Sequence, residues 1–286
     1  MLEDFRNSTI LRAPLLALTR KVFGLLQGGP GIFQRAVYDA MSVPYIVTTH
    51  QEHYVVSTKD KVIGRELFLR GEFDFKKFQT ALTILNREGQ SCPAHLIDVG
   101  ANIGSITIPA IKRGLVKTAT AIEPHPDNLR LLKANLALND LDSKVNVIPQ
   151  AVGKESATTL YLNESPTNSG NHSIGVNGIP IKCMRLDDLP FPPNSLLWMD
   201  IEGYEGHALA GAAHLLATGI AIVCEYNPLF LNKSKGATMF REALNNRKIF
   251  ELQNNTKTQT NLAAIDDELS KLPCTQQWTD IIAIQK

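Results

Sequence analysis

The sequence predicts an α/β fold with a doubly wound, mostly parallel sheet and helices on both faces. Short apolar runs alternate with helical stretches from residue 94 onward, and such alternation is typical of parallel sheets. A glycine-spaced turn, DVGANIG, follows the first of these runs. The last run, WTDIIAIQ, is expected to be an edge strand that closes the sheet antiparallel.

Residues 1–90 are expected to form an N-terminal extension of helices and a hairpin. Residues 1 to about 40 have a largely helical pattern, interrupted by the breaker GGPG at 28–31. The alternating run YIVTTHQEHYVVSTKD predicts a β-hairpin, and helices are expected near 62–70 and 73–88. Ser-Cys-Pro at 91–93 separates this extension from a second domain, residues 91–286.

In the second domain the expected strands are AHLIDV, ATAIE, VNVIP, SLLWMDI and IAIVCEY. The helices expected between them are IGSITIPAIKRG, PDNLRLLKANLALND, EGHALAGAAHLLATG and a stretch near 236–247. After the third strand, ATTLYLN and IPIKCMRL are expected to pair around an insertion, ESPTNSGNHSIGVNG. A polar loop of this kind on an α/β scaffold is a usual place for ligand contacts.

Composition excludes several classes of protein. The chain has 286 residues, 44% hydrophobic and 20% charged, which is typical of a globular protein. Its 29 basic and 28 acidic residues leave a net charge of +1, so a nucleic-acid partner is not expected. No apolar run reaches the roughly 18 residues of a membrane-spanning helix.

The cysteines indicate a reducing compartment. Cys92, Cys183, Cys224 and Cys274 form no C-x-x-C pair, so neither a zinc knuckle nor a dithiol motif is predicted. Scattered single thiols fit the cytoplasm better than a disulfide framework. Cys224, in the run IAIVCEY, is expected to be buried.

The N-terminal stretch MLEDFRNSTILRAPLLALTRKVFGLLQGGPG has two interpretations. Its early acids, Glu3 and Asp4, argue against a signal peptide. The favoured interpretation is a helix that packs on its own domain or on a partner. The alternative is a peripheral membrane contact, because Leu and Phe side chains stand beside Arg12, Arg20 and Lys21.

The turn DVGANIG stands where ligands bind in such a sheet, beyond the carboxyl end of a strand. Gly100 is expected to permit a tight turn, and Gly104 a close approach of helix to strand. The dinucleotide-binding pattern has three glycines, whereas Asn102 replaces the middle one here. The pattern therefore favours a ligand that has no diphosphate at the start of the helix.

Acids at two strand ends indicate what that ligand is. Asp98 would repel a diphosphate but attract an ammonium group. Glu123, at the end of the next strand, suits the two hydroxyls of a ribose. An acid for a cation, glycines for a close backbone and an acid for ribose together describe S-adenosylmethionine. The alternative for Glu123 is a solvated acid at a strand end.

Four segments, LIDVGANIG, AIEPHPDN, VIPQAVG and MDIEGYE, resemble the FkbM family of S-adenosylmethionine-dependent methyltransferases. The resemblance covers roughly residues 94 to 230, and the motifs occur in the family's order. It implies a class I methyltransferase (Rossmann-like) fold with seven strands. It also implies methylation of a substrate hydroxyl, often on a sugar or a polyketide. Residues 1 to about 90 match much less well, so their role stays open.

The resemblance also implies cofactor contacts. Gln150 and Ala151, at the end of the third strand, would lie near the adenine, and Glu123 would hold the ribose. GEFD at 71–74 resembles a family segment, so Glu72 is a further candidate, although a surface acid fits it equally well. The methionine end is assigned to Asp98, Gly100, Asn102 and Gly104.

Methyl transfer to a hydroxyl needs an aligned nucleophile and a group that takes its proton, or a metal that lowers the hydroxyl pKa. In a doubly wound sheet the fourth strand neighbours the first, so Asp200 is expected beside the transferring methyl group. We predict Asp200 and Glu202 as the core of the site. Glu225 is a further catalytic candidate, and His172 is either the base, a substrate ligand or a merely solvated loop residue.

Two neighbouring polar residues are expected to be structural. Glu205 begins a helix, where the helix dipole alone favours an acid, and His207 lies within that helix.

Asp200, Glu202 and Glu225 could together hold Mg²⁺, since hard cations take carboxylate oxygens. Nothing in their spacing demands a metal, and none is predicted.

The predicted function is O-methylation of a small-molecule or glycan acceptor, such as a sugar or a secondary metabolite. One alternative is N-methylation of a small amine or a protein, but MDIEG stands where an N-P-P-Y-type tetrapeptide would be expected. A second alternative is a non-catalytic module that binds the nucleoside and recruits a partner through residues 1–90. The oligomeric state is not predicted.

Overall fold

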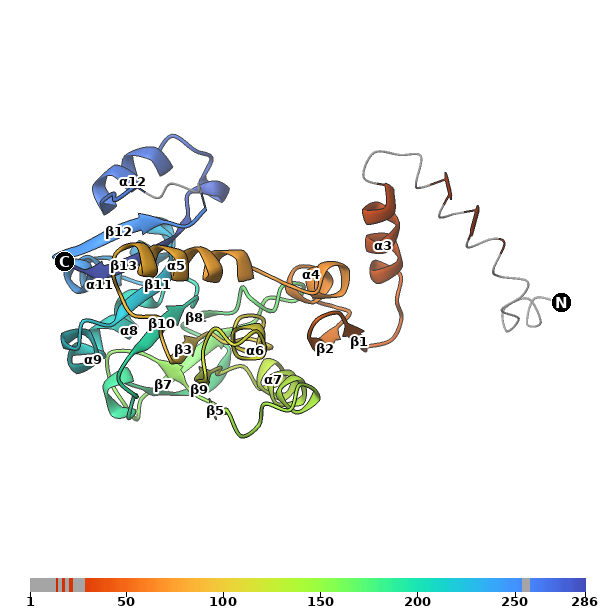
Figure 1. Ribbon diagram of the computed structural model, residues 1–286, viewed down its shortest axis with the longest axis horizontal. Helices are drawn as coiled ribbons and strands as arrows, with labels where there is room; N and C mark the ends of the chain where they lie inside the picture. Colours follow the sequence, from red (N-terminus) through yellow and green to blue (C-terminus); the bar gives the residue numbers. More distant parts are fainter. Residues whose placement is uncertain (1–13, 15–16, 19–20, 23–28, 254–257) are drawn as a thin grey trace.

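The computed structural model describes residues 14, 17–18, 21–22, 29–253 and 258–286. Its centre is a single seven-stranded sheet (Figure 1). The strands are β3 (His95–Val99), β4 (Thr118–Ile122), β5 (Val145–Ile148), β10 (Ser195–Met199), β11 (Ala221–Tyr226), β12 (Arg247–Glu251) and β13 (Thr279–Gln285). Their order is β12-β13-β11-β10-β3-β4-β5. Strands β11 to β5 run parallel, and β13 runs antiparallel to both of its neighbours.

Helices cover both faces of this sheet, as predicted. One face carries α5 (Phe75–Arg87), α6 (Thr107–Lys112) and α7 (Pro126–Leu138); the other carries α8 (Glu205–Ala210), α9 (Ala213–Ala217), α10 (Pro228–Lys233), α11 (Ala237–Leu244) and α12 (Leu262–Leu269). Two short 3₁₀ helices, Leu186–Asp188 and Cys274–Gln276, lie in connections. Within β10, Trp198 points into one core and Met199 into the other, as alternation along a strand requires. This topology is the class I methyltransferase fold.

The structure corrects two details of the predicted second domain. WTDIIAIQ is antiparallel, but it lies inside the sheet, because β12 pairs with its outer side. EGHALAGAAHLLATG forms two helices instead of one. The break falls at Gly211, where a Cβ would collide with the carbonyl of Gly153. The chain therefore bends at this point to let two backbones approach closely.

The extension contains α3 (Gly29–Asp39), the hairpin β1 (Tyr45–Thr49) and β2 (His53–Ser57), and α4 (Ile63–Arg70). The hairpin and the helices near 62–70 and 73–88 are therefore confirmed. Residues 29–31 of GGPG form the start of α3, which suits a proline in a first turn. The predicted interruption of a helix before them lies outside the described residues. The helical prediction for residues 1–28 lies outside the described residues, except at 14, 17–18 and 21–22, which are helical.

The extension packs on the methyltransferase fold as part of one core. Buried side chains of residues 38–85 belong to the same hydrophobic cluster as one face of the sheet, and α3, α4 and the hairpin gather at one end of the molecule (Figure 1). Two asparagines, one in α7 and one directly after it, bind the backbone of β2. Asn135 accepts from Val55 N at 2.6 Å, and Asn139 accepts from His53 N at 3.1 Å.

After β5 the chain forms a second, four-stranded sheet. Its strands are β6 (Ala151–Val152), β7 (Thr159–Asn163), β8 (Ser173–Gly175) and β9 (Ile179–Met184), in the order β6-β9-β7-β8. The predicted pairing of ATTLYLN with IPIKCMRL is confirmed as β7 with β9. The insertion, residues 164–178, joins these strands and contains β8.

Cys224 is buried as predicted, and all four cysteines are free thiols. Among the described residues, no helix combines the length and the apolar character that crossing a bilayer would need.

Candidate functional site

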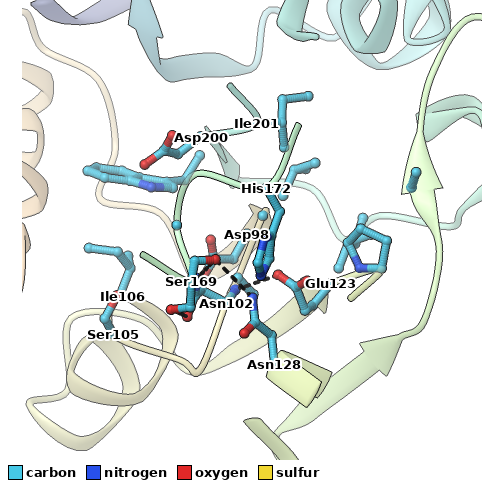
Figure 2. Close-up of a pocket in the computed structure, with 18 of the residues that line it drawn as sticks. Asp98, Asn102, Ser105, Ile106, Glu123, Asn128, Ser169, His172, Asp200 and Ile201 are labelled. Carbon is cyan, nitrogen blue, oxygen red and sulfur yellow. Dashed lines mark hydrogen bonds between the residues drawn. The ribbon is translucent and has the colours of Figure 1, made fainter. Parts of the chain in front are cut away.

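A cavity that is partly open to solvent lies at the carboxyl ends of β3, β4 and β10 (Figure 2). Most of the predicted site residues line it, namely Asp98, Gly100, Asn102, Glu123, Ala151, His172 and Asp200. Residues that are distant in sequence therefore meet at one edge of the sheet, as the topology predicts.

The turn after β3 brings the first strand against the fourth. Gly100 has a φ of 84°, and a Cβ on it would collide with the carbonyl of Asp200. The amides of Gly100 and Ala101 both donate to Ile122 O, at 2.9 and 3.1 Å, which fixes the turn on β4. Only glycine combines this backbone conformation with this close approach. Asp200 is held beside the turn as a result.

Asp98 is buried at the floor of the cavity, with 1% of its surface exposed. It accepts a hydrogen bond from Thr107 Oγ1 at 2.5 Å. Burial raises the pKa of Asp98 to about 6, although the bond from Thr107 acts in the opposite direction. A cation bound beside this carboxylate would stabilise its charged form.

Glu123 organises the neighbouring turns. Its two carboxylate oxygens accept from Asn102 N at 2.9 Å and from His125 N at 2.8 Å. Burial raises the pKa of Glu123 to about 7, and the backbone amides and the Asn128 side chain oppose that rise. Each carboxylate oxygen has a further lone pair, so the group can still accept from ligand hydroxyls.

His172 reaches the cavity from the insertion and stacks on His125, with ring centroids 4.1 Å apart. Its Nδ1 accepts from Ser165 N at 3.0 Å, which leaves the proton of the neutral ring on Nε2. Burial, followed by the charge of His125, lowers the pKa of His172 to about 4. Near neutral pH this side chain is therefore a hydrogen-bond donor and a weak proton acceptor. These properties favour the ligand role predicted for it over the role of base.

Three carboxyl groups gather at the ends of β10 and β11. Oxygens of Asp200, Glu202 and Glu225 all lie within 4.8 Å of one another. Solvent reaches Asp200 through the cavity; even so, the surrounding protein and the charges of Glu225 and Glu202 raise its pKa. Burial followed by neighbouring acids raises the pKa of Glu202 to about 7 and that of Glu225 to about 8. Such a cluster can hold a proton or a hard cation.

Glu202 and Glu225 adjoin the cavity through Asp200 and do not line it themselves. Glu202 has a φ of 55°, an uncommon conformation for a residue other than glycine. Asn227 Nδ2 donates to Glu225 at 3.3 Å. The fourth and fifth strands thus bring together the acids that the sequence predicts at their ends.

Three predicted cofactor contacts do not line the cavity: Gly104, Gln150 and Glu72. Gly104 has a φ of 93°, and a Cβ on it would clash with Ile108, so its place is a packing position. Glu72 pairs with Arg113 at 3.3 Å and lines a separate cleft. Its neighbours Phe73 and Asp74 line the cavity instead.

Glu205 and His207 have the structural partners expected of them. Glu205 Oε1 accepts from Ile201 N at 3.0 Å and from Gly203 N at 3.4 Å, which closes the turn between β10 and α8. His207 Nε2 lies 2.8 Å from Ser234 O.

Sequence reasoning missed Ser169 and Asn128, which line the cavity beside Asn102. Ser169 O accepts from Asn102 Nδ2 at 2.8 Å and from Asn128 Nδ2 at 3.1 Å. Asn128 lies in the first turn of α7, where a polar residue is common and does not by itself indicate a ligand contact. Ser169 belongs to the polar insertion, but no local pattern in that loop distinguishes it.

Comparison with known proteins gives three findings. The sequence model of the Methyltransferase FkbM domain matches residues 98–264. A cobalt-precorrin-6B C(15)-methyltransferase (decarboxylating) of Salmonella typhimurium is 36% identical over 100 residues, which are 33% of this chain and 52% of that protein. The chain therefore spans about half the length of the curated relatives it matches.

Solved structures with a similar arrangement include a methyltransferase FkbM from Methylobacillus flagellatus, with a TM-score of 0.41 and 15% identity. The likeness covers 90% of this chain and 59% of that one. An O-methyltransferase from Bacillus cereus, in complex with S-adenosylhomocysteine, has a TM-score of 0.41 and 12% identity, covering 74% and 80% of the two chains.

Proposed function

The chain belongs to the FkbM methyltransferase domain family, and from this premise we propose that it transfers a methyl group from S-adenosylmethionine to an acceptor hydroxyl. The observation that carries the proposal is one cavity bordered by Asp98, Glu123 and Asp200, from the ends of three adjacent strands. Asp98 and Glu123 suit the cofactor, and Asp200 borders the place where an acceptor would have to bind.

In the proposed complex Asp98 faces the ammonium group of the methionine end, and the backbone at Gly100 lies against it. Glu123 accepts from the ribose hydroxyls in charge-assisted hydrogen bonds. The adenine lies toward Ala151 and the apolar side chains of the second sheet, Leu162 and Ile174, which also line the cavity. His172 Nε2 is free to donate to the nucleoside or to the acceptor.

The proposed reaction is an in-line displacement at the methyl carbon. A lone pair of the acceptor oxygen forms the new C–O bond while the C–S bond breaks, and its electron pair stays on sulfur to give S-adenosylhomocysteine. The acceptor proton passes to the carboxylate of Asp200. Its raised pKa makes that carboxylate a stronger base than an ordinary aspartate.

An amine is the second candidate for the acceptor. The acids at the ends of β10 and β11 would attract an ammonium group, which must lose a proton before it attacks. Mass spectrometry of extracts from cells with and without the protein would identify the methylated product. Fragmentation then separates an O-methyl from an N-methyl product.

Binding of S-adenosylhomocysteine, measured by calorimetry, tests the cofactor assignment. Asp98→Ala and Glu123→Ala should each weaken binding at least tenfold, about 1.4 kcal/mol, because each removes a buried partner of the ligand. A matched control is Asp267→Ala, which removes an exposed acid of α12 paired with Lys271. Wild-type affinity in both cavity variants would show that the assignment is wrong.

A further inference from the structure

We propose that Ser169 is a positioning residue that fastens the insertion, residues 164–178, over the cofactor cavity and ties it to the N-terminal extension. The proposal rests on the function proposed above, because it identifies the cavity as the cofactor site. It gives the extension a role in binding the cofactor, although the whole extension, residues 1–90, lies outside the family match.

The backbone of Ser169 binds the turn after β3, which borders the proposed cofactor site. Its carbonyl accepts from the side-chain amides of Asn102 and Asn128, which are 7% and 4% exposed. Asn102 also donates its backbone N–H to Glu123. Figure 2 shows these side chains meeting beside Glu123. If the insertion moved away, the side-chain amides of Asn102 and Asn128 would lose a common acceptor, which is unfavourable for buried polar groups.

The side chain of Ser169 reaches in another direction, to the extension. Its Oγ lies 2.5 Å from Asp60 Oδ2 and 3.2 Å from Asn102 Oδ1. A hydroxyl has one proton, and the shorter, charge-assisted bond to Asp60 takes it. Asp60 follows the hairpin, and its other oxygen accepts from Val62 N at 2.9 Å at the start of α4.

Two further contacts hold the insertion against the same part of the extension. Lys61 N donates to Thr167 O at 2.8 Å. A Cβ on Gly170 would lie 3.0 Å from Ile63 Cδ1, so the loop backbone packs closely on α4. Ile63 and Gly170 both line the cavity. The insertion thus forms one wall of the site, and its bond at Ser169 joins the extension, the turn after β3 and α7.

Because the insertion forms one wall of the cavity, we expect the bond from Ser169 to Asp60 to influence how fast a nucleoside leaves. Ser169→Ala removes the bond to Asp60 and keeps the carbonyl. We expect S-adenosylhomocysteine to dissociate from this variant about tenfold faster and to bind about tenfold more weakly, a change of about 1.4 kcal/mol in binding free energy, because the insertion loses a charge-assisted bond that fastens it. Ser169→Thr, which keeps the hydroxyl, should stay within about twofold of wild type.

The double variant tests whether Asp60 is the partner. Asp60→Asn keeps an acceptor for Val62 N but removes the charge, and we expect a smaller change in the same direction. Adding it to Ser169→Ala should change dissociation no further, because both substitutions break one bond. Val176→Ala, at an 88% exposed position of the same insertion, is the control and should behave as wild type.

Hydrogen exchange of the ligand-free chain separates this proposal from the proposed function. We expect Ser169→Ala to speed exchange in residues 164–175 while β7 and the thermal midpoint stay unchanged. Equal exchange and equal dissociation in Ser169→Ala and wild type would overturn the positioning role. Absence of binding to the wild type would overturn the cofactor assignment, and the exchange comparison would still decide whether Ser169 fastens the loop.

Discussion

Asp200 combines two properties that a proton acceptor in methyl transfer needs. It borders the cavity directly beside the turn at Gly100, and its surroundings raise its pKa. Asp200→Asn keeps the shape of the side chain but removes the basic oxygen. We therefore expect this variant to bind S-adenosylhomocysteine within about twofold of wild type and to lose turnover about 100-fold or more, the lower end of general-base contributions.

Turnover is measured by release of S-adenosylhomocysteine once the acceptor is identified, and retained turnover in Asp200→Asn would exclude Asp200 from the chemistry. The same assay with EDTA decides how the acids at the ends of β10 and β11 act. Activity that survives EDTA fits the predicted metal-free base. Activity lost in EDTA and restored by Mg²⁺ would mean that Asp200, Glu202 and Glu225 bind a cation.

At the residue scale, strand ends were the predictable part of the site. Asp98, Glu123 and Asp200 each follow an apolar run, and parallel strands bring such positions to one edge. Glu72 was not predictable in the same way, because its direction depends on Arg113, 41 residues away along the chain. Ser169 depends on how a polar loop folds back, and composition alone does not encode that path.

The turn between β10 and α8 contains a buried carboxyl group, which is unfavourable in its charged form. Glu205 closes it while 1% exposed, and burial raises the pKa of this side chain to about 7. Burial also raises the pKa of Asp98 to about 6, of Glu123 and Glu202 to about 7, and of Glu225 to about 8. In the unfolded chain these groups ionise near pH 4.

These carboxyl groups therefore bind more protons in the folded chain than in the unfolded chain between about pH 4 and pH 8. Stability from these groups is present at the acidic end and is lost as pH rises through the raised values. We expect the free energy of unfolding of the ligand-free protein, from urea titrations, to fall between pH 5 and pH 8. Each group contributes at most about 1.4 kcal/mol per pH unit.

Glu205→Gln assigns part of that slope. Its side-chain oxygen can still accept from the two amides of the turn, but it does not titrate, so the fall in stability should become shallower. Glu242→Gln, at an exposed acid of α11, should leave the slope unchanged. A wild-type protein whose stability rises between pH 5 and pH 8 would contradict the assignment.

Helices and strands with a clear hydrophobic periodicity are predicted from the sequence with nearly correct bounds. The elements that the prediction misses have a physical cause. The sequence does not predict β12, because RKIFE begins with two charged residues and buries only Ile249, Phe250 and Glu251. Its place outside β13 is set by pairing with a neighbour, not by its own pattern. The split of α8 from α9 likewise follows from a tertiary contact at Gly211.

For the whole molecule, the docking of the extension was the least predictable feature. The pattern of expected helices and strands separates residues 1–90 from the rest of the chain. In the structure, however, α5 and the hairpin share a hydrophobic core with the sheet. Phe78 of α5 packs on Trp198 of β10, with ring centroids 5.8 Å apart. Such contacts join side chains that are distant in sequence. The hydrophobic periodicity of a helix or strand therefore indicates which face is buried, but not which element that face packs against.

The N-terminal segment carries the last whole-molecule prediction. From residue 5 to residue 38 the chain has no acidic residue, and the bases are Arg6, Arg12, Arg20, Lys21 and Arg35. Within the described part, Leu18, Val22 and Ile32 are each more than half exposed. Basic residues beside exposed apolar side chains suit an anionic lipid surface, where each base contributes about 1 kcal/mol.

We expect the full chain to sediment with vesicles of phosphatidylglycerol and phosphatidylcholine, and much less with phosphatidylcholine alone. Raising the salt should weaken the association, because screening removes the electrostatic part. Leu18→Asp with Val22→Asp should abolish it, since both changes remove apolar contact and reduce the local positive charge. Leu272→Asp, at another exposed leucine, should not. Equal sedimentation of the double variant and the wild type would place the contact elsewhere. Absence of sedimentation would leave the other interpretation, a helix that packs on its own domain or on a partner.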